Sequence, residues 1–353
     1  MIENSVIGSF AQFNCIAKYR SDVQFDWDYV YQRLNFRGVY GSDQFIKYQE
    51  LYLNQTAWRD HSVVIYKKNG EPCGIFNLHS IERDQNYLFT SAGLPIEPIQ
   101  FLEEVSHKER KRLIKGILLG LIKYTSLNNF DKFQCHAYFD CNSGSVGPWH
   151  EICAELAISS TFRHQVFLDL TSSIEQIKAG FRKSYKPLIG RAEKLWDASI
   201  LTFSVITDED WAEFKSLHFS AAGNRQTRSD ESWAEQYKQI LEEKAFLVTI
   251  KTTENNLIGG GYFQHTANQC IYSVGAYDRA LFEYPIGHLV QWLAINKMKQ
   301  LGIQSYIIGD RPYPSNLHNP TPKELSIGMF KEGFSNTKRV QFIFQLPNDY
   351  KQQ

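Results

Sequence analysis

The order of secondary-structure signals repeats along this chain, and the repeat limits the folds that it can adopt. In each half, short apolar strands joined by turns precede one long amphipathic helix and a further strand. Two such units predict a mixed α/β fold with tandem domains, and a cleft between or beside them as the natural place for a site. The predicted strands lie at 63–66, 73–78, 87–89 and 132–139 in the first half and at 245–250, 257–264, 270–277 and 304–310 in the second, and the long helices at 102–124 and 286–301.

Composition describes a globular chain and gives no overall signal for a polyanionic partner. The 353 residues are 43% hydrophobic, and Lys+Arg and Asp+Glu number 38 each, so any basic site has to be local. The amino-terminal residues lack the order of a signal peptide, and the most apolar window, 113–124, is too short to cross a bilayer. The six cysteines are scattered without a CxxC pair. We therefore expect a cytoplasmic protein with no metal and no transmembrane segment.

One lysine near the C-terminus has an apolar setting. Lys331 lies within Phe330-Lys-Glu-Gly-Phe334, in a short helix ahead of the last strand. A partly desolvated ammonium interacts strongly with a developing anion or a phosphate. Asp310 ends the preceding strand and could accept a proton from an amine. The alternatives are a solvated lysine and a turn-forming aspartate.

Two further stretches are rich in cations. The first begins at Arg182, includes Lys183 and Arg191, and has a net charge of +4 over 182–194 because five cations oppose one glutamate. The second is a loop with two nearby arginines, Arg225 and Arg228. Guanidinium and ammonium groups in such stretches favour capture of phosphate or carboxylate. A solvated helix face explains the first stretch equally well.

Four segments, in this order, resemble motifs of the Fem family (FemABX) of aminoacyl and acyl transferases within the GNAT superfamily. They are Phe181–Lys194, Asn224–Arg228, Ser273–Asp278 and Phe330–Phe334. The resemblance implies a degenerate GNAT-like domain over 1–160, a transferase domain over 161–353, and a reaction centre at Lys331. We predict Lys331 and Asp310 as catalytic residues. The predicted substrate-binding residues are Arg182, Lys183, Arg191, Arg225, Arg228, Tyr277, Phe330 and Phe334.

The activity that the resemblance implies is transfer of an acyl or aminoacyl group to an amine, such as a nucleotide-linked amino sugar or another cell-envelope precursor. The donor stays open. The near-neutral charge favours acyl-CoA or acyl-carrier protein, whereas aminoacyl-tRNA with a peptidoglycan-precursor acceptor is favoured by a missing glycine loop. Ordinary GNAT enzymes cradle coenzyme A with that loop, and Glu283–His288, with one glycine, stands in its place. A non-catalytic ligand-binding protein is a further alternative. No tightly bound cofactor is expected.

Overall fold

The chain forms two compact units that are interleaved in sequence. The computed structural model describes residues 5–53, 58–83, 85–139, 146–335 and 337–349. Unit 1 comprises Met1–Gly41, Leu53–Arg163 and Arg339–Gln353, and unit 2 comprises Ser42–Tyr52 and His164–Lys338. The chain therefore leaves unit 1 twice: the first time it adds a single helix to unit 2 and returns, and the second time it supplies His164–Lys338 before returning for the last segment. Separate roles for 1–160 and 161–353 stay a prediction.

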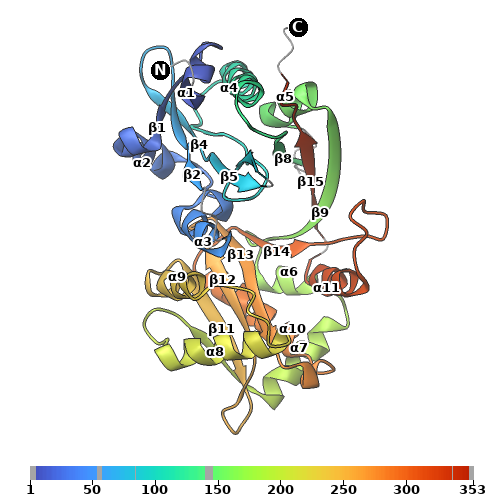
Figure 1. Cartoon of the computed structure of the whole chain (residues 1–353). Coiled ribbons are helices and arrows are strands. Elements are labelled where there is room, and N and C mark those ends of the chain that lie inside the picture. Colours follow the sequence, from blue (N-terminus) through green and yellow to red (C-terminus); the bar gives the residue numbers. More distant parts are fainter. Residues whose placement is uncertain (1–4, 54–57, 84, 140–145, 336, 350–353) are drawn as a thin grey trace. The chain divides into compact units, whose positions relative to one another are not determined.

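Unit 1 contains two small antiparallel sheets and a strand pair, with helices packed on them (Figure 1). The strand orders are β1-β3-β4-β7 and β2-β5-β6, and β8 pairs antiparallel with β15. The helices are α1 (Val6–Ala11), α2 (Gln24–Arg33), α4 (His107–Leu127) and α5 (Pro148–Leu156). The strands are β1 (Ile16–Tyr19), β2 (Arg59–Asp60), β3 (Val63–Tyr66), β4 (Pro72–Phe76), β5 (His79–Arg83), β6 (Asn86–Thr90), β7 (Gln100–Phe101), β8 (Gln134–Phe139) and β15 (Lys338–Gln345).

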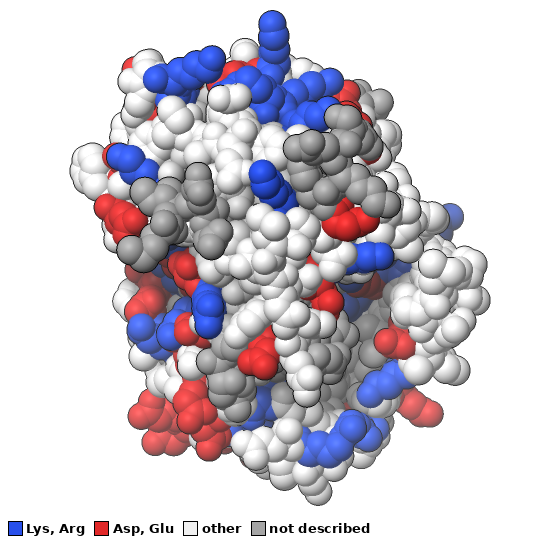
Figure 2. Space-filling model, turned by 45° about the horizontal axis from the view of Figure 1, so that its top comes forward, with Lys and Arg blue, Asp and Glu red and all other residues white. Residues whose placement is uncertain are grey.

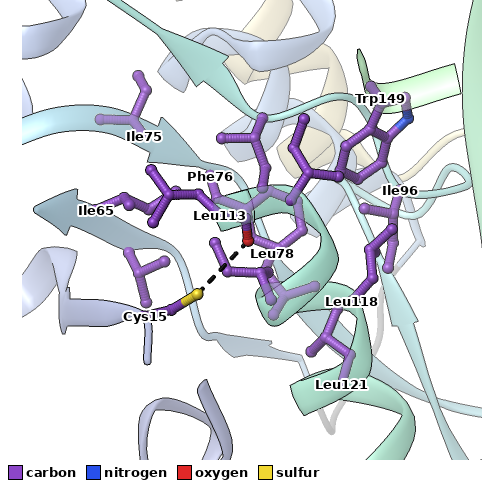
Figure 3. Packing of buried hydrophobic residues seen from close by; sticks show 14 of the residues in the cluster. Cys15, Ile65, Ile75, Phe76, Leu78, Ile96, Leu113, Leu118, Leu121 and Trp149 are labelled. Atoms are coloured by element: carbon purple, nitrogen blue, oxygen red, sulfur yellow. Dashed lines mark hydrogen bonds between the residues drawn. The ribbon is translucent and has the colours of Figure 1, made fainter. Parts of the chain in front are cut away.

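Helix α4 supplies much of the core of unit 1. Figure 3 shows its apolar side chains, among them Leu113 and Leu118, packed with Phe76 and other strand residues. The helix begins five residues later than predicted, because the Ser106 hydroxyl caps it by accepting a hydrogen bond from the Glu109 amide. The apolar residues just before this cap, Leu102 and Val105, are buried but do not have helical backbone. The prediction counted them as part of the helix because they extend its apolar pattern.

Unit 2 has one sheet with helices on both faces. Its strand order is β10-β11-β12-β13-β14-β9, and only the pair β13–β14 is parallel. The helices are α3 (Asp43–Leu53), α6 (Ile174–Ala179), α7 (Tyr185–Leu195), α8 (Asp208–Ala221), α9 (Asp230–Leu241), α10 (Ile286–Gln300) and α11 (Pro322–Glu332). The strands are β9 (Ser159–Asp169), β10 (Asp197–Leu201), β11 (Ala245–Lys251), β12 (Leu257–His265), β13 (Gln269–Tyr277) and β14 (Ser305–Asp310).

Alternation along β11 explains the two helical layers of unit 2. Phe246 and Val248 join the hydrophobic cluster that contains α7 and α10 residues, whereas Leu247 joins the cluster of α8 and α9. Successive side chains of a strand point to opposite faces of the sheet, so both faces of this central strand are buried. The predicted fold class, mixed α/β, is confirmed.

The charged surface agrees with the balanced composition. On the face that Figure 2 presents, basic and acidic side chains are interspersed with uncharged ones. Within the described ranges, no helix combines the length and apolar character needed to cross a membrane. The compartment stays a prediction.

Candidate functional site

The two predicted catalytic residues lie together at the end of β14. A Cβ atom added at Gly309 would lie 2.2 Å from Lys331 Nζ, so the ammonium rests directly against this glycine. Gly309 has a φ of +134°, a conformation that L side chains rarely adopt. Burial lowers the pKa of Lys331, and the charge of Asp310 partly opposes this by raising it. The result is a desolvated ammonium beside a carboxylate at a strand end.

Three charged side chains anchor the helix that carries Lys331. Glu332 accepts a hydrogen bond of 2.8 Å from Arg311 Nε and forms an ion pair with Lys338. Burial raises the pKa of Glu332, but the hydrogen bonds from Lys338 and Arg311 outweigh it and hold that pKa below its usual range. These contacts fix α11 against the end of β14, where Arg311 follows the strand.

Arg182 holds the same C-terminal end of this helix from another direction in the sequence. Its guanidinium donates to the Met329 carbonyl at 3.2 Å, and its amide donates to the Gly333 carbonyl at 2.8 Å. A cation at a helix C-terminus satisfies unpaired carbonyls and opposes the negative end of the helix dipole. Arg182 therefore has a structural task at α11, and its predicted contact with substrate stays a prediction.

The two phenylalanines on either side of Lys331 in the sequence, Phe330 and Phe334, belong to one aromatic cluster. The His288 ring lies 4.3 Å from Tyr185 and 5.1 Å from Phe330, measured between centroids, and Phe334 is fully buried beside them. Burial, with a further contribution from the Arg182 charge, lowers the pKa of His288 to about 4, so this imidazole is neutral at pH 7.

Gly333 permits the close approach of this cluster to α11. A Cβ atom there would lie 2.2 Å from two ring carbons of Tyr185, whose hydroxyl donates to the Phe330 carbonyl at 3.0 Å. The residues of the Phe330–Phe334 run thus divide between two tasks. The aromatic residues and the glycine pack the helix, whereas Lys331 and Glu332 face the end of β14.

The parallel pair β13–β14 is only partly closed. Its register is Gln269–Ile271 against Ser305–Ile307, and the described residues of both strands beyond these positions are not paired with each other. Unpaired strand edges inside a sheet offer backbone donors and acceptors to an extended ligand. Gly309 and Lys331 lie on the β14 side of this opening.

The β13 side of the opening carries Tyr277. Its hydroxyl lies 2.7 Å from that of Tyr272. Both rings pack closely on Gly275, because a Cβ there would lie 1.9 Å from the Tyr272 hydroxyl and 3.2 Å from a ring carbon of Tyr277. Gly275 is exposed although its strand is central in the sheet. A Cβ at Gly287 would lie 3.1 Å from Phe330 and 3.6 Å from Tyr277. The structure therefore brings Tyr277 and Phe330 to one place.

The two predicted arginines of the second basic stretch line a cavity of about 440 Å³. Arg228 donates from Nε to the Tyr48 hydroxyl at 3.1 Å, and its Nη1 lies 2.8 Å from His218 Nε2. Burial and the Arg228 charge lower the pKa of His218 to about 4, so its Nε2 accepts this hydrogen bond at neutral pH. The remaining lining residues are Ala212, Lys215, Ser216, Phe219, Gln226, Thr227, Asp230 and Trp233.

Lys183 and Arg191 are exposed at the α7 end of the unit. Lys183 precedes the helix, and the Arg191 guanidinium lies 5.8 Å from the Tyr284 ring. Neither has an ion pair with a described residue. Their exposure agrees with both interpretations of the basic segment, and their binding role stays a prediction.

Several contributing residues escaped the sequence interpretation. Tyr48 and His218 contact Arg228 from helices far apart in sequence, and Gly309 makes room for Lys331. Only Gly309 had a local signal, since a glycine at a strand end next to an aspartate often marks an unusual backbone conformation. The described residues include no group of three His, Cys, Asp or Glu that could hold a metal ion.

Comparison with known proteins identifies the fold. No protein-family model matches the sequence, and no curated protein matches it. The crystal structure of FemX matches with a TM-score of 0.65 at 11% identity, covering 94% of this chain and 97% of that one. The chain has the FemX fold. The predicted resemblance to the Fem family is confirmed at this level.

Two further structures share the fold. A C-terminal domain ascribed to a lysylphosphatidylglycerol synthetase of Agrobacterium fabrum matches with a TM-score of 0.57 at 9% identity, covering 92% of this chain and 91% of that one. L-PGS from Bacillus licheniformis matches with a TM-score of 0.52 at 10% identity, covering 88% and 93%. At these identities the FemX-like fold is shared, and activity has to be argued from the site.

Proposed function

We propose that this FemX-like chain is an acyltransferase that moves an acyl or aminoacyl group from an activated ester or thioester to an amine. The observation that carries the proposal is the desolvated Lys331 ammonium against Gly309, next to Asp310 and beside the unpaired edges of β13 and β14. The opening would take the extended donor, with its carbonyl near the ammonium.

The proposed reaction assigns one proton task to each catalytic residue. Asp310 accepts a proton from the acceptor ammonium, and the resulting amine attacks the donor carbonyl carbon. The Lys331 ammonium stabilises the tetrahedral oxyanion and gives a proton to the departing sulfur or oxygen. A C–N bond forms and the C–S or C–O bond breaks. The nitrogen of the tetrahedral intermediate loses its second N–H proton to solvent, and the proton held by Asp310 returns to Lys331, so both residues regain their starting states. The products are an amide, a thiol or alcohol, and that one released proton.

The cavity of Arg225 and Arg228 supports an acceptor that carries an anionic group. Arg228 forms no ion pair with a described residue, and Asp230, the carboxylate in the lining, is paired with Lys215 at 2.6 Å. A guanidinium without a carboxylate partner suits a phosphate or carboxylate of a ligand. A nucleotide-linked amino sugar or another envelope precursor meets this requirement.

An aminoacyl ester is the second candidate donor. Gly287, the glycine at the place of the expected coenzyme A loop, packs against Phe330, so an aromatic ring adjoins it on its Cβ side. One structure with the same fold is named for lysylphosphatidylglycerol synthesis, and that name supports aminoacyl transfer. Both observations favour an aminoacyl-tRNA donor over acyl-CoA.

A donor panel tests the proposal. Purified protein is incubated with acetyl-CoA, acyl-carrier protein or aminoacyl-tRNA and with amino-sugar nucleotides, and amide formation is followed by mass spectrometry. We expect Lys331→Met to lower transfer by roughly 10²–10³-fold. Lys323→Met, an exposed lysine at the start of the same helix, serves as the matched control. Transfer by Lys331→Met at the rate of Lys323→Met contradicts the proposal, and tight binding of one ligand without transfer revives the non-catalytic alternative.

A further inference from the structure

Helix α3 belongs by sequence to the first half of the chain but is built into unit 2. Two glutamines fasten it there. Gln239 donates to the Gln44 carbonyl at 2.8 Å, and Gln44 donates from its side chain to the His265 carbonyl at 3.2 Å. These bonds join α3 to α9 and to the end of β12, so the helix has a defined place in the unit.

The same helix orients the guanidinium of Arg228. The Tyr48 hydroxyl accepts the Nε hydrogen bond at 3.1 Å, and the Tyr52 ring lies 5.8 Å from the guanidinium carbon. The two tyrosine rings stack at 5.5 Å. Trp233 of α9 lies 5.3 Å from the same carbon. Arg228 is therefore held between α3 and the α8–α9 pair.

This arrangement leaves part of the guanidinium available. A guanidinium has five N–H donors, and the described partners, Tyr48 and His218, take one each. The Nη2 group, with two of the remaining three donors, has no described acceptor. Planar N–H pairs bind oxyanions in a bidentate manner, and the two occupied donors leave both N–H groups of Nη2 and one of Nη1 for that purpose.

Resting on the proposed function, we propose that Tyr48 of α3 is a positioning residue for an oxyanion of the acceptor, phosphate or carboxylate, in the Arg228 cavity. Tyr48 fixes the rotation of the guanidinium before the ligand arrives. Ordering a long side chain in advance lowers the entropy that binding must otherwise remove. Since binding favours the oriented state, the anion in turn stabilises α3 in its place.

Calorimetric titration with inorganic pyrophosphate and with citrate tests the proposal on wild type and variants. We expect Tyr48→Phe to weaken binding roughly fivefold with little change in melting temperature, and Arg228→Met to abolish it. Tyr52→Phe is the matched control, because it also loses a hydroxyl but keeps the ring that faces Arg228. Preference for pyrophosphate or for citrate tells whether the natural group is a phosphate or a carboxylate.

Hydrogen exchange provides a readout that needs no variant. We expect saturating anion to slow exchange in peptides spanning 43–53 of the wild-type protein, and Tyr48→Phe to remove the effect. Equal anion affinity of Tyr48→Phe and Tyr52→Phe, or binding without protection of α3, overturns the inference and leaves the proposed transfer at Lys331 untouched. Absence of anion binding by the wild type also overturns the inference. Failure of the proposed function is a separate result, in which Lys331→Met transfers the acyl group at the rate of the control variant.

Discussion

Substitution of Gly309 by alanine should disable the lysine without removing it. The added Cβ would lie 2.2 Å from Lys331 Nζ, about 1.2 Å short of ordinary contact, which begins at 3.4 Å. The ammonium is the far end of a flexible side chain and can move, so the stability cost comes mainly from the φ of +134° and amounts to about 1–3 kcal/mol. A displacement of about 1 Å at a reacting group can cost roughly 10²-fold in rate.

A double-mutant cycle measures whether this effect passes through Lys331. We compare kcat/KM of wild type, Gly309→Ala, Lys331→Met and the double variant with the donor and acceptor identified by the panel, and measure unfolding in urea alongside. Once Lys331 is methionine, the alanine should have little further effect on the rate, because the displaced group is already gone. Near-normal activity of Gly309→Ala, or rate losses that multiply in the double variant, would refute the reasoning.

Two further predictions concern the same helix and its neighbour. Burial lowers the pKa of Lys331 from 10.5. Because the charged form is the active one, kcat/KM should fall as pH rises through that lowered pKa. Lys331 should also react with acetic anhydride at a lower pH than Lys323, and identical labelling profiles of the two lysines would contradict the lowered pKa. Gly333→Ala should lower the free energy of unfolding by about 1–3 kcal/mol, because its Cβ meets the Tyr185 ring. Gly190→Ala, with nothing within 4 Å, should instead raise it by up to about 1 kcal/mol; chemical denaturation of both variants decides, and equal effects would contradict the packing argument.

Local patterns predicted the central strands and the long helix of unit 2 because their determinants are close in sequence. The strands at 245–250 and 257–264 and the helix at 286–301 occur within a residue or two of their predicted bounds. The first 60 residues lacked such patterns, and their helices were not predicted. Helix α3 is the clearest case, since its burial depends on partners such as Gln239 that lie far along the chain.

The sequence by itself determined the alternation that builds a mixed α/β fold and the run that carries Lys331, because strand and helix periods and turn residues act over a few positions. Only the tertiary structure decided which side chains meet. In that structure the Lys331 ammonium lies against Gly309, Arg182 donates to a carbonyl at the C-terminal end of α11, and Arg228 donates to the Tyr48 hydroxyl. Such contacts depend on the packing of whole elements, whose energy is spread over many residues, and no short segment encodes them.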